Sequence, residues 1–219
     1  MSTWAAIFDW DGVIVDSSAL HEESWNVMAA REGLPLPTGH FKKGFGMKNE
    51  IIIPEVLGWS RDPGEIERLA REKERTYREL VKESGIDPVP GVVGLLTELK
   101  KAGVPCAIGS STHRKNIDCV LDLIRLGEFF TAIVSGDEVK NGKPDPEIFV
   151  TAAQRLGFKP GQCVVFEDAH VGIEAAKAGG MKVVGVATTH PADTLEGADL
   201  IVQGVADIRI ADVARLVGS

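Results

Sequence analysis

Short apolar runs alternate with helical patterns from residue 89 almost to the end of the chain, and this alternation limits the fold more than any other feature. The runs are rich in Val, Ile and Ala, which is typical of strands buried on both faces of a parallel sheet. We expect strands at 4–8, 104–108, 131–134, 163–166, 182–186 and 200–202. Strands that alternate with helices predict an α/β fold, here a Rossmann-like doubly wound parallel sheet with helices on both faces.

Residues 17–88 interrupt this alternation with helical patterns alone. Helices are expected from residue 17 to about 31, from 49 to about 58, and from 64 to 84 after Pro63. We therefore expect a Rossmann-like core built from residues 1–16 and 89–219, with an all-helical cap domain, residues 17–88, inserted between its first strand and the rest.

Composition excludes several classes of function. The net charge of −8 over 219 residues argues against binding to nucleic acid. No apolar run approaches the length of a membrane span, and the first residues lack the pattern of a secretory signal. The three cysteines are odd in number and widely spaced, so neither a disulfide framework nor a zinc site is indicated. We expect a cytoplasmic monomer or homodimer with no membrane and no nucleic-acid partner.

Two aspartates follow the first expected strand, in the run Asp9-Trp10-Asp11-Gly12. Alternate residues of an extended chain point to the same side, so Asp9 and Asp11 lie close together. Such a pair of carboxylates costs free energy unless a cation or a proton sits between them. A hard divalent ion such as Mg²⁺ takes oxygen ligands of this kind. The alternative is that Asp-x-Asp-Gly is only a turn.

Polar residues follow three further strands as well. Ser110 and Ser111 come after strand 104–108, Lys143 precedes the helix that begins near 145, and Glu167 and Asp168 end strand 163–166. Taken singly, these residues could be a helix cap, a loop lysine and an acidic helix start. Ligands of open parallel sheets bind outside the carboxyl ends of the strands, however. Because all of these residues follow the carboxyl ends of successive strands, we predict that they form one site with Asp9 and Asp11.

The residue types suit the transfer of a phosphoryl group. The negative charge of a phosphate monoester repels nucleophiles, and Mg²⁺, Ser110 and Lys143 would neutralise that charge and orient the group. Asp9 could then attack phosphorus and form an aspartyl-phosphate. Asp11 could protonate the leaving alkoxide and later act as a base toward water.

These motifs, taken together, resemble those of the haloacid dehalogenase-like superfamily, in the branch with a helical cap after the first strand. The resemblance covers essentially the whole chain and includes Asp9-Trp10-Asp11-Gly12-Val13, Ser110, Lys143-Pro144-Asp145-Pro146, Glu167-Asp168 and Gly172-Ile173-Glu174-Ala175-Ala176. It implies that Asp9 is the nucleophile, Asp11 the acid and base, and Ser110, Ser111 and Lys143 the phosphate ligands. It also implies that Mg²⁺ is bound by Asp9, Glu167, Asp168 and, through its backbone carbonyl, Asp11.

Within that branch the chain looks similar to β-phosphoglucomutases and small sugar-phosphate phosphatases. This similarity makes His21, Lys48 and Lys73 candidate substrate contacts of the cap. The alternatives are a satisfied interfacial histidine for His21 and a lysine snorkelling from a groove for Lys73. The segment 43–48 departs from the mutases, because Met47 stands where they carry an arginine for a second phosphate. Lys48 could replace that arginine after a small shift of register.

The sequence therefore predicts a Mg²⁺-dependent phosphohydrolase that acts on a small phosphorylated metabolite, a sugar phosphate or similar monoester. The alternatives are a phosphoryl-transfer isomerase of the β-phosphoglucomutase type, an inorganic pyrophosphatase and a receiver-like signalling module. The helical insertion and the order Asp9-Trp10-Asp11 count against the signalling module. Asp11 argues against cleavage of a carbon–halogen bond, because true dehalogenases lack this second aspartate.

Overall fold

The computed structural model describes residues 2–44 and 47–218. The chain divides into two compact units, the first made of residues 1–16 and 86–219 and the second of residues 17–85. Each unit is described by itself below.

The first unit contains a parallel sheet of six strands in the order β3-β2-β1-β4-β5-β6. The strands are β1 (Ala5–Phe8), β2 (Cys106–Gly109), β3 (Phe130–Val134), β4 (Cys163–Glu167), β5 (Lys182–Val186) and β6 (Leu200–Val202). The expected α/β fold with a doubly wound parallel sheet is confirmed.

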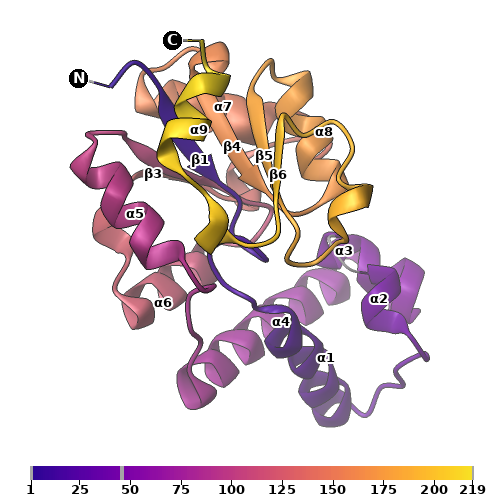
Figure 1. Ribbon diagram of the computed structural model, residues 1–219. Helices are drawn as coiled ribbons and strands as arrows, with labels where there is room; N and C mark the ends of the chain where they lie inside the picture. Colours follow the sequence, from indigo (N-terminus) through magenta and orange to yellow (C-terminus); the bar gives the residue numbers. More distant parts are fainter. Residues whose placement is uncertain (1, 45–46, 219) are drawn as a thin grey trace. The chain divides into compact units, whose positions relative to one another are not determined.

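Helices cover both faces of this sheet (Figure 1). α7 lies against β1, β2 and β3 and α8 against β4 and β5, while α5 packs beside α9 on the opposite face. The helices of the unit are α5 (Val92–Lys101), α6 (Arg114–Ile124), α7 (Glu147–Leu156), α8 (His170–Ala178) and α9 (Ile210–Leu216). Short 3₁₀ turns occupy Gly127–Phe129, Gly136–Glu138, Pro160–Gln162, Ala192–Thr194 and Val205–Asp207.

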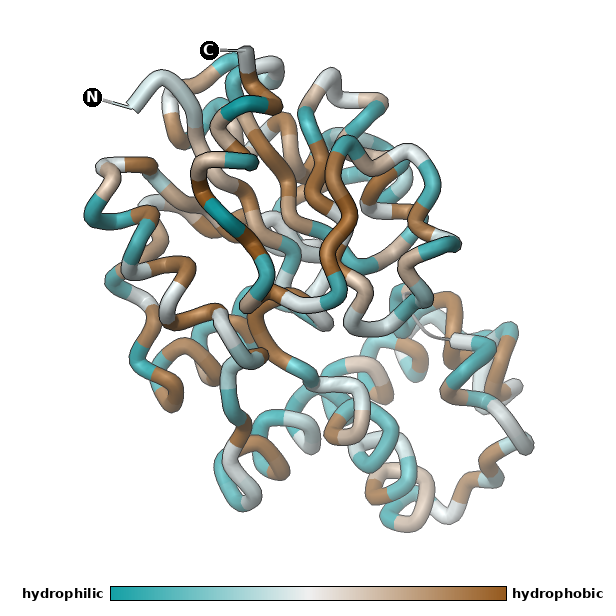
Figure 2. Tube along the Cα trace, in the orientation of Figure 1, coloured by the Kyte–Doolittle hydropathy of each residue, from teal (hydrophilic) through white to brown (hydrophobic). Residues whose placement is uncertain are grey.

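The core of the first unit follows from the apolar strands. Every residue of β1, β2 and β4 is buried, and Figure 2 shows the hydrophobic positions concentrated along the strands. On one face, α7 buries Ile148, Phe149, Ala152 and Ala153 against this layer. The sheet is thus a rigid base for the polar residues that follow its strands.

In the second unit, the described regular elements are all helical. They are α1 (Ser18–Glu32), α2 (His40–Gly44), α3 (Asn49–Ile51), a π-helical segment (Ile52–Leu57) and α4 (Pro63–Ser84). α1 and α4 pack side by side. Their apolar faces share a core with the π-helical segment that contains Trp25, Met28, Ile52, Ile53, Leu57, Leu69 and Ala70.

The N-termini of α4 and α3 differ in how they are capped. Asp62 accepts a hydrogen bond from the Glu65 backbone N–H at 2.9 Å and caps α4, with Pro63 at its first position. At α3 the N-cap position is taken by Lys48, and the side chain of Asn49, the first residue of the helix, donates to Glu74 Oε1 at 2.6 Å.

The second unit ends slightly earlier than the sequence predicts. Residues 86–88 belong to the first unit rather than to the helical insertion. The chain is held there by backbone pairing, since Pro88 bridges Val15 and the Val89 N–H donates to Ile14 O at 2.9 Å.

Candidate active site

The strand register places the predicted polar residues at one level of the sheet. Phe8 of β1 pairs with Ile108 of β2 and with Phe166 of β4, so the next residue on each strand follows in step. Asp9 therefore lies level with Gly109 and Glu167. The strand order reverses between β1 and β4, which is where open α/β sheets form a ligand-binding crevice.

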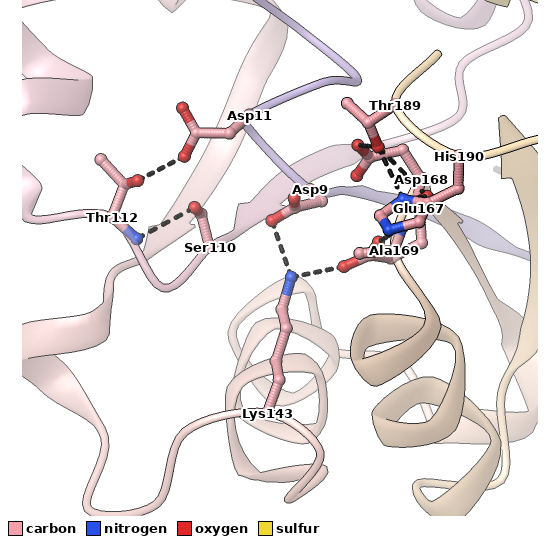
Figure 3. Close-up of polar contacts among 10 residues, drawn as sticks. All are labelled: Asp9, Asp11, Ser110, Thr112, Lys143, Glu167, Asp168, Ala169, Thr189 and His190. Carbon is pink, nitrogen blue, oxygen red and sulfur yellow. Dashed lines mark hydrogen bonds and ion pairs between the residues drawn. The ribbon is translucent and has the colours of Figure 1, made fainter. Parts of the chain in front are cut away.

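Lys143 joins the first and fourth strands at this point (Figure 3). Its Nζ donates to Asp9 Oδ1 at 2.7 Å and to Glu167 Oε1 at 2.6 Å. All three side chains are at least nine-tenths buried. A hydrogen-bonded ion network that is shielded from water in this way is held in a defined geometry.

Asp168 extends the group to three buried carboxylates. Ligand atoms of Asp9, Glu167 and Asp168 all lie within 4.8 Å of one another. The Thr189 hydroxyl donates to Asp168 Oδ2, and the other Glu167 oxygen accepts from the Ala169 backbone N–H at 2.7 Å. The structure thus brings together three of the predicted metal ligands.

The electrostatics of the group reflect this concentration of negative charge. Burial raises the pKa of Asp9 to about 6, although Lys143 pulls in the opposite direction. Burial, together with the charges of Glu167 and Asp9, raises the pKa of Asp168 to about 8. Burial disfavours the Lys143 ammonium, but Asp9 and Glu167 outweigh that effect and raise its pKa. One ammonium does not balance three carboxylates.

A divalent cation fits this arrangement. A cation stabilises the charged form of these buried carboxylates, which desolvation and mutual repulsion otherwise disfavour. A donor set made only of oxygen atoms also suits Mg²⁺. Two glycines give the ligands their space. A Cβ at Gly12 would lie 2.0 Å from Asp168 Oδ2, and a Cβ at Gly172 would lie 1.6 Å from Glu167 Oε1. The cation that the family implies would therefore be held by Asp9, Glu167 and Asp168.

Asp11 lies outside this acidic group. Its Oδ2 accepts a hydrogen bond from Thr112 Oγ1 at 2.5 Å, and the Thr112 N–H donates to Ser110 Oγ at 3.1 Å. The predicted acid/base residue is thus linked to the predicted phosphate loop. Ser110 is buried, whereas Ser111 is exposed. The role that the resemblance gives to the Asp11 backbone carbonyl stays a proposal.

The second unit holds the three predicted cap residues. His21 of α1 and Lys73 of α4 meet at 2.8 Å between Nδ1 and Nζ, and Lys73 also donates to Glu74 Oε1 at 3.0 Å. His21 stacks on Tyr77 with ring centroids 3.9 Å apart. Lys48 is exposed. Their predicted contacts with a substrate stay predictions, and Phe45 and Gly46, in the segment 43–48, lie outside the described residues.

Sequence reasoning missed the threonines that support the site. Thr112 holds Asp11, Thr189 holds Asp168, and Thr188 donates to the Gly12 carbonyl at 2.6 Å. A usable signal existed, because Thr112 follows β2 and the other two follow β5, both at the edge where ligands bind.

Comparison with known proteins identifies the family. Residues 6–186 match the family model described as haloacid dehalogenase-like hydrolase. A chloroplastic 5-amino-6-(5-phospho-D-ribitylamino)uracil phosphatase of Arabidopsis thaliana is 38% identical over 96% of this chain. The chain spans only 57% of that relative's length.

Two further relatives match along nearly their whole length. The β-phosphoglucomutase of Bacillus subtilis is 34% identical, over 94% of this chain and 92% of its own. The solved structure of a family IA hydrolase from Entamoeba histolytica superposes with a TM-score of 0.88 at 30% identity, covering 99% of this chain and 100% of its own. The chain therefore belongs to the haloacid dehalogenase-like hydrolase family.

Membership of this family, together with phosphatases among its relatives, defines the protein as an enzyme that hydrolyses phosphate esters. The predicted family and enzyme class are confirmed. Within the part of the chain that the structure describes, no helix is both long and apolar enough to cross a membrane.

Proposed function

We propose that the protein is a Mg²⁺-dependent phosphatase of a small phosphorylated metabolite, a sugar phosphate or similar monoester, that works through an aspartyl-phosphate on Asp9. The observation that carries this proposal is the buried network of Asp9, Lys143 and Glu167 at the switch point of the sheet, beside Asp168. It combines a nucleophile, a phosphate-binding cation and a set of metal ligands within reach of one phosphate.

Each residue of the site then has a role in the proposed reaction. Lys143, Ser110 and Ser111 bind the phosphate and hold it for attack by an Asp9 oxygen on phosphorus. Asp11 gives a proton to the oxygen of the leaving alcohol as its bond to phosphorus breaks. It then takes a proton from the water that releases phosphate from Asp9. Mg²⁺, when bound by Asp9, Glu167 and Asp168, supplies positive charge that offsets the negative charge of the phosphate.

We further propose that residues 17–85 act as the cap that selects the substrate, with His21, Lys48 and Lys73 as contacts. Lys73 supports this reading because a lysine with only 5% of its side chain exposed is unusual in a helix as charged as α4. The cytoplasmic location and the monomeric or dimeric state remain predictions of the sequence.

A mutase is the second candidate, because the B. subtilis mutase matches the chain along nearly its whole length. A mutase of this type handles a sugar with two phosphates. Met47 takes the place that the resemblance assigns to an arginine for the second phosphate, and Met47 is half-exposed and uncharged. We therefore favour water over a second sugar hydroxyl as the acceptor of the phosphoryl group.

The test is release of phosphate with Mg²⁺ across a panel of phosphorylated metabolites. The panel includes fructose 1-phosphate, the phosphoribityl compound in the name of the Arabidopsis relative, and pyrophosphate. β-Glucose 1-phosphate is followed in parallel for conversion to glucose 6-phosphate. Steady release from one or a few monoesters supports the phosphatase. Conversion without release would establish the mutase, release from pyrophosphate alone would establish a pyrophosphatase, and no turnover at all would refute the proposal.

A further inference from the structure

The Thr112 hydroxyl donates a hydrogen bond to Asp11, the proposed acid/base residue. Thr112 Oγ1 lies 2.5 Å from Asp11 Oδ2, and both residues belong to the first unit. We propose that Thr112 is a positioning residue that aims Asp11 at the leaving-group oxygen, so that it determines which alcohols the enzyme can expel. This inference rests on the proposed phosphatase function, and it names a residue that sets the enzyme's selectivity for the leaving alcohol.

The place of Thr112 is fixed independently of Asp11. Its backbone N–H donates to Ser110 Oγ at 3.1 Å, and its carbonyl accepts from the Gly136 N–H at 3.2 Å. The loop around Thr112 approaches Gly136 so closely that a Cβ there would lie 2.2 Å from Ser111 O. The side chain of Thr112 is therefore presented by a backbone that is held on both sides.

A hydroxyl partner suits a residue that must change its protonation state. In the first step an Asp9 oxygen bonds to phosphorus, the ester P–O bond breaks, and Asp11 gives its proton to the departing alcohol oxygen. In the second step water bonds to phosphorus, the Asp9–phosphorus bond breaks, and Asp11 takes the proton from water. A threonine hydroxyl can donate to the carboxylate and can accept from the carboxylic acid. An ammonium partner would favour only the carboxylate.

The consequence is a dependence on the leaving group. An alkyl alcohol leaves poorly unless it is protonated, whereas p-nitrophenol leaves as a stable anion. If Thr112 aims Asp11, its loss harms the cleavage of alkyl phosphates far more than that of p-nitrophenyl phosphate. A merely structural role for Thr112 would harm both alike.

The experiment compares kcat/KM for fructose 1-phosphate and for p-nitrophenyl phosphate in the wild type and in Thr112→Val, Thr112→Ser and Thr112→Ala. The ratio of the two values on one preparation does not depend on how much of the protein is folded. Thr97→Val is the matched control, because the Thr97 hydroxyl donates to the Val93 carbonyl of its own helix at 2.7 Å and Thr97 lies outside the proposed site. Should fructose 1-phosphate not be hydrolysed, the best alkyl phosphate of the panel replaces it.

In Thr112→Val and Thr112→Ala we expect the ratio to shift against the alkyl phosphate by about 10- to 100-fold, the range that misplaced acid catalysis gives. Thr112→Ser and Thr97→Val should keep the ratio of the wild type. An unchanged ratio in Thr112→Val, or a Thr112→Ser variant that behaves like Thr112→Val, would overturn the inference. A wild type that cleaves no phosphate ester would instead overturn the proposed function itself.

Discussion

At the scale of single residues, the charge balance of the site determines how it responds to pH. The ordinary pKa of an aspartate is 3.8, whereas burial raises that of Asp9 to about 6 and that of Asp168 to about 8. Without a cation, the folded protein therefore holds protons that the unfolded chain has lost. The free energy of unfolding of the metal-free protein must fall as the pH rises through this window.

Mg²⁺ reverses this trend, because it has to displace the same protons from Asp9 and Asp168. We expect the apparent affinity for Mg²⁺ to be on the order of 100-fold weaker at pH 6 than at pH 8, because protons on Asp9 and Asp168 compete with the cation. The gain in melting temperature over a sample with EDTA should therefore be small at pH 6 and large at pH 8. Thermal unfolding at both pH values with a series of Mg²⁺ concentrations measures it.

The matched control for this prediction is Asp168→Asn, which keeps the shape of the side chain and removes its charge. It should lose most of the stabilisation by Mg²⁺ and part of the pH dependence of the metal-free protein. Equal stabilisation by Mg²⁺ at pH 6 and pH 8 in the wild type would contradict the proposed ligand set.

The sequence predicts which strand ends carry the polar residues of this site, but not which side chains pair with one another. Asp9, Lys143 and Glu167 follow strands or precede helices in a pattern that only a shared site explains. Thr112 and Thr189 follow strands at the same edge, but their roles come from the carboxylates of Asp11 and Asp168, to which their hydroxyls donate. Such pairings depend on three-dimensional geometry, which residue spacing does not contain.

At the scale of elements, close approach of α8 to β4 is required for the position of Glu167. Gly172 lies in the first turns of α8, where any side chain would collide with the Glu167 carboxylate. The family resemblance marks this glycine only as part of a pattern, and the structure supplies the physical reason.

Gly172→Ala should therefore displace Glu167 and weaken Mg²⁺ binding by about 10- to 100-fold, with a matching loss of phosphatase activity at limiting Mg²⁺. Isothermal titration with Mg²⁺ measures the affinity directly. Gly94→Ala is the control, because Gly94 also lies in a helix, α5, but a Cβ there meets nothing within 4 Å. It should stabilise the protein by about 0.5–1 kcal/mol and leave Mg²⁺ binding unchanged. Unchanged Mg²⁺ binding in Gly172→Ala would remove Glu167 from the ligand set.

Element positions were predictable to different degrees. The strands could be located because buried apolar runs leave few alternatives, as in β4, which is Cys163–Glu167 against an expected 163–166. The segment from 49 to 58 was predicted as one helix and contains α3 followed by a π-helical segment, Ile52–Leu57. Nothing in residue spacing distinguishes a π-helix from an α-helix over so short a stretch.

At the scale of the whole molecule, the chain combines an α/β unit with a helical unit. The three buried carboxylates, Asp9, Glu167 and Asp168, all belong to the α/β unit. The order of the strands could not be read from the sequence, because the alternation of strands and helices fits several arrangements. The reversal between β1 and β4 explains why residues 9 and 167 meet.

The division of labour between the units can be tested at Lys73. If it contacts an anionic substrate, Lys73→Ala should raise KM or lower kcat for that substrate by about ten-fold. Removal of Lys73 also disturbs a buried network, so a control is needed. Asn49→Ala removes the 2.6 Å hydrogen bond to Glu74 in the same network but leaves the ammonium in place. Steady-state kinetics and thermal unfolding of both variants separate the two effects, and a loss of stability alone in Lys73→Ala would assign Lys73 to packing.

The most direct measurement is a rapid acid quench of the enzyme during turnover of a ³²P-labelled substrate with Mg²⁺, followed by mapping of the labelled peptide. If Asp9 is the nucleophile, ³²P appears on the peptide that contains Asp9 as fast as the alcohol is released, and borohydride converts residue 9 to homoserine. Asp9→Asn should form no labelled enzyme and release no phosphate while it keeps the melting temperature of a folded protein. Label on a different residue, or steady phosphate release with no labelled enzyme at any time, would contradict the proposed role of Asp9.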